Sequence, residues 1–340
     1  MSMKCCPRFL PPPPSPRDDR GAALIAVLVL LMTVSLLAMS MAALSQLATL
    51  GTRGDADRLR SAYLAEGALN RAIWLTAADR VLYGATNPAN VAYEDFDDER
   101  FLADGVDREM DYYGVTVRYR ILPGAGGVTV TGSSAADALN QLLSVKTASD
   151  GDLAEDVRRF SAKVQDYADS NDLLTEDGME EGDYEEQGMR PLPRNNNIQY
   201  REELWWIPDA VRFFPPDRDG RLTLVNPLTL PSTVRQVSLY TANYALLTNY
   251  GNLESDDARE VLRTLKEFRR TREPLSETLD PLLWSNLTSR FTTQDNGIFR
   301  IVIENALPDS VGGSYRLDAT LALPDLRAGG TVTYYDWMRY

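Results

Sequence analysis

The sequence predicts an α+β protein: one long N-terminal helix, followed by an antiparallel sheet that a large helical insertion interrupts. Three observations predict this class. An apolar run without charged residues, 22–50, continues into an amphipathic helical pattern over 51–80. Apolar and polar residues alternate over 115–121 and again within 291–340, which is typical of strands with one buried face. Between these regions, in 135–290, apolar residues recur with a helical period.

The composition narrows the classes of function. The chain has 340 residues and a formal net charge of −14, which disfavours nucleic-acid binding because phosphates require a cationic face. Its one concentrated basic stretch, "LKEFRRTR", has helical spacing and is interpreted as a solvated helix face. There is no histidine, and Cys5 and Cys6 both precede the apolar run. The usual general base and thiolate metal sites are therefore missing from the rest of the chain, and we expect no enzymatic activity.

The apolar run is long enough to cross a bilayer as a helix, which takes about 20 apolar residues. Basic residues precede it, and by the positive-inside rule they hold the N-terminus in the cytoplasm. We therefore expect a single pass through the inner membrane, with the body of the chain in the periplasm. The basic residues are Lys4, Arg8, Arg17 and Arg20.

A secretory signal peptide is the alternative interpretation, since small residues near Ala38, Ser40 and Ala42 suit its peptidase. Two features count against it. The run exceeds the roughly 7 to 15 apolar residues of a signal peptide. The helical pattern also continues through 51–80, where one face carries Leu59, Ala62, Leu69, Ala72 and Ile73. We expect one helix whose first half lies in a membrane and whose second half packs against protein.

Strand patterns occupy two regions, 81–134 and 291–340. In the first, Val115, Val117 and Tyr119 face one way, "PGAGG" is a predicted turn, and "VTVTG" is the predicted partner strand. The second region contains three predicted strands, "IFRIVIE", "YRLDATLAL" and "GTVTYYDWM".

The insertion contains two strong helical patterns. The apolar face of the first is Leu153, Val157, Phe160, Val164 and Tyr167. The second is "SDDAREVLRTLKEFRR", with Ser255 as the candidate N-cap and Pro274 just beyond its end.

An acidic run follows the first of these helices, with no basic residue among ten carboxylates. Such a run repels itself unless it is solvated or neutralised by cations. Oxygen ligands on a loop suit calcium, and Gly178 and Gly182 allow the backbone to fold around an ion. The spacing is not that of an EF-hand, so a solvated loop and a calcium loop both remain open. The carboxylates are Asp166, Asp169, Asp172, Glu176, Asp177, Glu180, Glu181, Asp183, Glu185 and Glu186.

The junction before the apolar run resembles that of type IV prepilins and pseudopilins. Arg20-Gly21 stands directly before "AALIAVLVLL". The resemblance implies that 1–21 is a leader, that prepilin peptidase cuts between Gly21 and Ala22, and that it methylates the new N-terminus. The family usually has glutamate at the fifth mature position, where this chain has Ala26. Among pseudopilins, the general secretion pathway protein K family of type II secretion lacks that glutamate, which implies a position at the tip of the pseudopilus.

The acidic run also resembles this K family. The family pattern is an aspartate-rich stretch, then G-A-E, a tyrosine, a proline-asparagine and E-L, and here "DYADSND", "GMEE", Tyr184, "PRN" and "EL" follow in that order, with Tyr and Ala in place of Trp and Ile. The resemblance implies calcium, a long helix on an antiparallel sheet as in pilins, and an insertion of two SAM-like helical units. The "N-x-N-T-A" stretch before the second unit is not intact. The candidate calcium ligands are Asp172, Glu180, Glu181 and Asp183.

These features predict a non-enzymatic minor pseudopilin at the tip of a type II secretion pseudopilus, supporting export across the outer membrane. The implied partners are minor pseudopilins of the I and J types, prepilin peptidase and the inner membrane, and not nucleic acid. Two alternatives remain: a minor pilin of a type IV pilus, and a membrane-anchored enzyme that uses carboxylates, such as a glycosidase. For the enzyme, no positioned carboxylate pair is recognisable in the sequence.

Overall fold

A computed structural model describes residues 20–93, 99–129, 137, 139–140, 142–143, 151–190, 192–226, 236–306, 314–323 and 330–340. The chain divides into two compact units, which separate within the first helix between Arg58 and Leu59. The predicted leader up to residue 19, including Cys5 and Cys6, lies outside the described residues.

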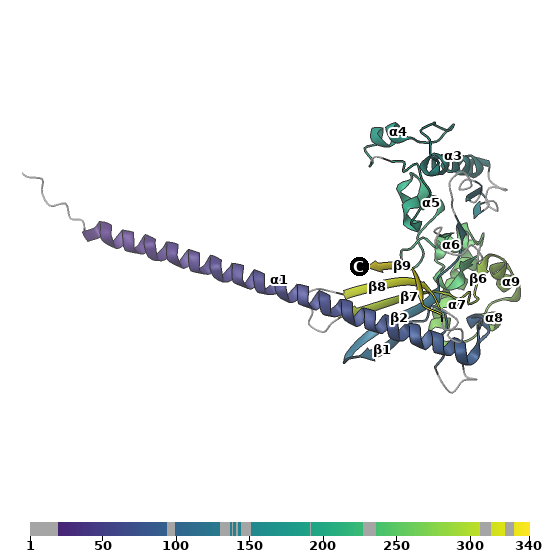
Figure 1. The fold of residues 1–340 in the computed structure, drawn as a ribbon, viewed down its shortest axis with the longest axis horizontal. Helices are drawn as coiled ribbons and strands as arrows, with labels where there is room; N and C mark the ends of the chain where they lie inside the picture. Colours follow the sequence, from purple (N-terminus) through teal and green to yellow (C-terminus); the bar gives the residue numbers. More distant parts are fainter. Residues whose placement is uncertain are drawn as a thin grey trace, which may run out of the picture. The chain divides into compact units, whose positions relative to one another are not determined.

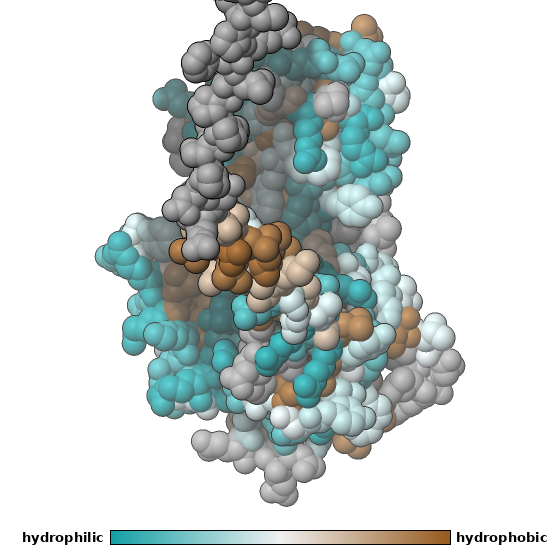
Figure 2. Space-filling model, turned by 90° about the vertical axis from the view of Figure 1, so that its left-hand side faces the viewer, coloured by the Kyte–Doolittle hydropathy of each residue, from teal (hydrophilic) through white to brown (hydrophobic). Residues whose placement is uncertain are grey.

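The first helix, α1 (Arg20–Tyr83), is continuous over 64 residues. In the first unit its residues 23–50 are all exposed, and Figure 2 shows hydrophobic side chains gathered over this helix. By length and composition α1 is able to cross a membrane, as the sequence predicts. It is therefore a candidate membrane anchor.

In the second unit, the C-terminal part of α1 packs on a five-stranded antiparallel sheet (Figure 1). Small buried residues, Ala65, Ala68 and Ala72, let the helix backbone approach the strands closely. Gly67 leaves room for the ring of Tyr112, which a Cβ at this position would displace.

The sheet has the order β1-β2-β7-β8-β9, with every neighbouring pair antiparallel. Its central strands bury the residues that alternate in the sequence, such as Val117 and Ile121, and Ile121 stands opposite Ile301. The predicted fold class, a pilin-like helix on an antiparallel sheet with a helical insertion, is confirmed. The strands are β1 (Arg108–Tyr112), β2 (Val115–Pro123), β7 (Ile298–Ala306), β8 (Ser314–Ala322) and β9 (Thr333–Arg339).

One predicted strand pairing is wrong. The "VTVTG" segment forms β3 (Val128–Thr129), which pairs in parallel with β4 (Val225–Asn226) and not with β2. The preceding glycines explain why the chain does not turn back. Gly126 and Gly127 pass against the backbone of Gln236 and Leu224, so closely that no Cβ fits. They carry the chain past these segments into the insertion.

The insertion separates β2 from β7, which are nevertheless neighbours in the sheet. Its helices share one apolar core, which includes Phe160, Tyr167, Leu265 and Phe268. A short parallel pair, β5 (Val237–Ser238) with β6 (Phe291–Thr292), lies near its end. The helical segments between β2 and β7 are α3 (Gly151–Ala168), α4 (Glu181–Glu186), η4 (Arg201–Trp206), α5 (Ala210–Phe213), η5 (Leu239–Thr241), α6 (Tyr244–Asn249), α7 (Ser255–Thr271), α8 (Leu275–Thr278) and α9 (Pro281–Arg290), while η1 (Pro88–Asn90) precedes β1.

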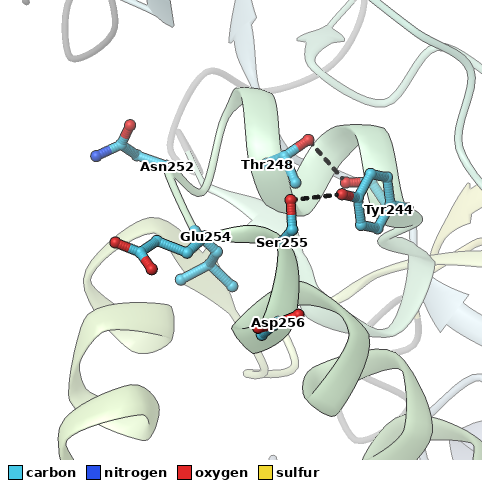
Figure 3. A pocket seen from close by; sticks show the side chains of 7 residues that line it. Tyr244, Thr248, Asn252, Glu254, Ser255 and Asp256 are labelled. Atoms are coloured by element: carbon cyan, nitrogen blue, oxygen red, sulfur yellow. Dashed lines mark hydrogen bonds between the residues drawn. The ribbon is translucent and has the colours of Figure 1, made fainter.

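The predicted N-cap of α7 is also wrong. Glu254 occupies the cap position, and Ser255 is the first helical residue. The hydroxyl of Ser255 accepts a hydrogen bond from the hydroxyl of Tyr244 on α6 at 3.0 Å, as Figure 3 shows. No side chain forms a capping hydrogen bond at the start of α7.

A buried group of charges, which we call the charged junction, joins the sheet to the insertion. It consists of Asp217 and Arg221 from the insertion with Arg300 on β7 and Asp318 on β8. The Arg300 guanidinium lies 2.7 Å from Asp318 and 2.9 Å from Asp217. Arg221 lies 3.7 Å from Asp318. Each carboxylate of the junction therefore contacts a guanidinium, and the insertion is fixed to the sheet through charge as well as apolar packing.

Candidate functional site

Two predicted sites fall on described residues: the processing site at Gly21–Ala22 and the acidic loop. Gly21 and Ala22 lie in the first turn of α1. Cleavage between them stays a prediction.

The acidic loop runs from the end of α3 to α4 and folds back onto α3. Its closure depends on Asp166, whose carboxylate is fully buried and accepts a hydrogen bond from the Thr175 amide at 3.1 Å. The Gly178 amide donates to the Thr175 carbonyl at 2.8 Å. A Cβ at Gly178 would collide with Oδ2 of Asp166, so this close return of the chain requires glycine.

The start of α4 fixes two more carboxylates beside this loop. Asp183 accepts a hydrogen bond from the Glu180 amide at 2.9 Å, as part of a capping box. Met179 and Tyr184 are buried under the same turn. Glu180 and Asp183 are thus held by α4, whereas Asp166 is held by α3.

The carboxylates of the loop share one electrostatic environment. Burial raises the pKa of Glu180, and the charges of Asp166, Asp169, Asp172 and Asp183 raise it further, to about 7. A neighbouring cation would lower this pKa, but no cation is among the main influences on Glu180. This part of the loop therefore carries negative charge that its surroundings do not neutralise.

On the outer side of the loop, in contrast to the surroundings of Glu180, a carboxylate is paired with a basic residue. There Asp177 forms an ion pair with Arg158 of α3, at 2.6 Å, and both side chains are largely exposed. This arginine neutralises Asp177 and Glu155, and it is not among the main influences on Glu180.

Four buried oxygen atoms at the loop have no hydrogen-bond partner among the described residues: Oδ1 of Asp166, Oε1 of Glu180, the hydroxyl of Tyr184 and Oδ1 of Asn195. Asn195 is tied to the loop because its amide nitrogen donates to Asp172 at 2.6 Å. Buried polar atoms are normally satisfied, so such a group needs an external partner. All four are hard oxygen donors, which fits calcium by ligand chemistry.

The carboxylates do not form a closed cage. Among the described residues, no three acidic side chains lie close enough to hold a metal ion as they stand. The oxygen donors and the negative charge of the loop fit a cation. To bind one, the carboxylates would have to move closer together around the ion.

Of the four predicted ligands, Asp172 and Asp183 are among the charges that act on a third, Glu180. Glu181 is exposed at the start of α4 and is not a main influence on Glu180. Whether any of them binds calcium remains a prediction.

Two residues that the sequence did not single out as ligands join this group. Asp166 begins the "DYADSND" stretch and lies on the buried face of α3, and a buried carboxylate requires a partner. Asn195 comes from a later segment, and no local pattern pairs it with Asp172.

Another acidic residue of the resembling stretch, Glu203, has a structural role. It is 1% exposed and accepts hydrogen bonds from Tyr167 at 3.0 Å and from Arg194 at 2.6 Å. Its charge is neutralised within the insertion, unlike that of Glu180.

No protein-family model matches the chain, and no curated protein matches its sequence. Among solved structures, a chain from "The Crystal Structure of the GspK-GspI-GspJ complex from enterotoxigenic Escherichia coli Type 2 Secretion System" is similar in fold. The TM-score is 0.50 at 11% sequence identity, over 85% of this chain and 99% of that chain. The chain therefore has a pseudopilin-like fold.

Proposed function

We propose that this chain is a minor pseudopilin of the K type, located at the tip of a type II secretion pseudopilus and supporting protein export across the outer membrane. The observation that carries the proposal is the pseudopilin-like fold with a large helical insertion between β2 and β7. Its role is assembly, with no chemistry of its own. The similar chain comes from a GspK-GspI-GspJ complex, which supports minor pseudopilins of the I and J types as partners.

The first half of α1 supports a tip position. Its apolar side chains are exposed over residues 23–50, and Ala26 stands where pilins usually carry glutamate. A helix of this kind suits a membrane before assembly and neighbouring helices afterwards. Without the glutamate carboxylate at this position, the helix has no negative charge to pair with the N-terminal amine of a subunit above it. The proposal includes the segments predicted from the sequence, which end at residues 21, 50, 80, 134 and 290. It also includes cleavage before Ala22, methylation of the new N-terminus at Ala22, and a periplasmic location for the body of the chain.

The acidic loop has a place in the same proposal as a calcium site. Asp166, Asp172, Glu180 and Asp183 are the residues that would hold the ion, with Asn195 beside them. Calcium would supply the positive charge that the neighbouring residues lack, and it would tie α3 to α4. The four unpartnered buried oxygens support this assignment.

The proposed function is tested in the bacterium that carries the gene. Deleting the gene should abolish type II secretion while leaving type IV pili intact, and the full-length gene should restore secretion. Loss of pili with normal secretion would favour a minor pilin instead. Mass spectrometry of the mature chain should find N-methylated Ala22 at its start. A start after Ala38 or later would indicate a secretory signal peptide and contradict the proposal.

The tip position is tested separately with Ala26→Glu. This variant should not improve secretion or lengthen the pseudopilus. A clear gain in either would place the subunit in the shaft.

A further inference from the structure

Helix α7 carries a line of exposed basic side chains, which we call the basic stripe. It consists of Arg259, Arg263, Lys266 and Arg270, and all four are exposed. Their spacing of four, three and four residues places them on one face of the helix. At a rise of about 1.5 Å per residue, the stripe is roughly 16 Å long.

The stripe is not needed to hold α7 in place. The opposite face of the helix packs into the core of the insertion through Ala258, Val261, Leu265 and Phe268. The stripe therefore lies on a surface whose position is fixed by other residues.

The centre of the stripe makes no direct ion pair within the part of the chain that the structure describes, although its charges act on the exposed Glu267 of the same helix. Arg259 pairs with Asp256 at 3.1 Å, and Arg270 pairs with Glu267, both across exposed positions on α7 itself. Arg263 and Lys266 form no ion pair with any described residue. Exposed ion pairs contribute about 0–1 kcal/mol, so even the two outer cations remain available to a partner.

We propose that the basic stripe is a docking surface for an acidic helix of a partner protein, whose carboxylates repeat with the same spacing of four, three and four residues. The argument is charge complementarity. Four cations aligned on one helix face meet four carboxylates aligned on another, because both helices follow the same repeat. Such pairs fix register and orientation as well as adding affinity.

A protein helix fits better than an anionic membrane. No large apolar side chain of α7 is exposed, so nothing beside the stripe would insert into lipid. The chain has a formal net charge of −14, and Asp256, Asp257 and Glu260 flank the stripe. A wide anionic surface would also face these acids and be repelled.

The test uses the full-length chain in non-ionic detergent and two fluorescent helical peptides of equal composition. One peptide carries four glutamates with spacings of four, three and four residues, and the other has the same glutamates distributed around the helix. Fluorescence anisotropy should give at least about tenfold tighter binding for the aligned peptide. The difference should shrink as salt rises above about 0.15 M.

The double variant Arg263→Glu and Lys266→Glu should weaken binding of the aligned peptide at least about tenfold. The matched control, Arg118→Glu with Arg159→Glu, changes net charge equally at exposed cations outside α7 and should bind like the native chain. The conservative pair Arg263→Lys and Lys266→Arg should also bind normally. Unchanged melting temperatures would show that the variants are folded.

Three results would overturn the proposal. Equal affinity for both peptides, or equal loss in the control variant, would mean that bulk charge alone attracts them. Sedimentation with phosphatidylglycerol vesicles without binding of the aligned peptide would assign the stripe to lipid. Self-association of the chain that the double reversal abolishes would assign it to a second copy.

Discussion

Asp318 of the charged junction and Glu180 of the acidic loop are carboxylates whose pKa values shift in opposite directions. In the junction, burial raises the pKa of Asp217 and alone would raise that of Asp318, but the Arg300 guanidinium 2.7 Å from Asp318 holds the pKa of Asp318 below its ordinary value. In the loop, burial and four neighbouring carboxylates raise the pKa of Glu180 to about 7. The junction is neutralised from within. No such guanidinium is among the main influences on Glu180, and this is why we propose that the loop takes a cation from solution.

This difference separates a structural role from a candidate functional one. Ion pairs that are closed inside the fold fix its parts and need nothing further. A carboxylate that is partly buried beside other carboxylates, with no arginine next to it, raises the free energy of the folded state unless a cation joins it. A high content of acidic residues therefore does not by itself indicate a cation site. Acidic residues that lack a neighbouring basic residue do indicate one.

The largest expected effect comes from breaking the junction. Arg300→Met leaves Asp217 and Asp318 buried without their main cation, and should lower the free energy of unfolding by about 3–5 kcal/mol. Urea unfolding of the full-length chain in detergent measures it. The control Arg118→Met removes an exposed guanidinium paired with Glu109 at 3.5 Å, and should cost no more than about 1 kcal/mol. Equal losses in both variants would refute the distinction between the two regions.

The second effect comes from supplying the loop with its cation. Calcium at about 100 times its dissociation constant should stabilise the folded chain by about 2.7 kcal/mol, because it binds the folded form selectively. Asp166→Asn with Glu180→Gln should abolish this gain. Glu185→Gln with Glu186→Gln, which removes the same charge from exposed positions on α4, should retain it.

Thermal melting with calcium, with magnesium and with chelator measures the gain. Magnesium prefers octahedral geometry and keeps its waters, so it should stabilise less. If both ions raised the melting temperature equally, the loop would be responding to general screening and the calcium site would be rejected.

A third, smaller effect distinguishes the predicted ligands from one another. Glu180→Gln should weaken calcium binding, whereas Glu181→Gln should change it little because Glu181 is exposed and outside the group that influences Glu180. Isothermal titration of each single variant compares their affinities. A larger loss of calcium affinity in Glu181→Gln than in Glu180→Gln would show that Glu181, and not Glu180, faces the ion.

The sequence predicted the fold where the periodicity is strong and local. Strands β2, β7 and β8 and helices α3 and α7 each bury the face that their apolar residues define. On α1 the predicted face is buried at Leu69, Ala72 and Ile73, but Leu59 is 58% exposed. Strand β1 was missed because "REMDY" is mostly polar, and two of its side chains are exposed at the sheet edge. The pairing of β3 depends on β4, which lies far along the chain.

The candidate site shows the same limit. The acidic run marked the loop, and the family resemblance implied the candidate ligands Asp172, Glu180, Glu181 and Asp183. Asp166 became a candidate only when the loop closed over it and left Oδ1 without a partner. Asn195 enters through a contact with Asp172 that no sequence pattern signals.

The smallest expected effect is the pH dependence of the metal-free loop. The pKa of Glu180 is raised from 4.5 to about 7, so between these values the folded state binds more protons than the unfolded state. Stability therefore falls as pH rises through this window, opposite to the usual paired carboxylate. Because the side chain is only partly buried, solvent screening keeps the change below about 1 kcal/mol. Urea unfolding with chelator at about pH 5 and about pH 8 should show this fall in the native chain relative to Glu180→Gln, whose amide does not titrate. An identical pH dependence in both proteins would mean that the neighbouring carboxylates do not act on Glu180, and the comparison with the junction would lose its electrostatic basis.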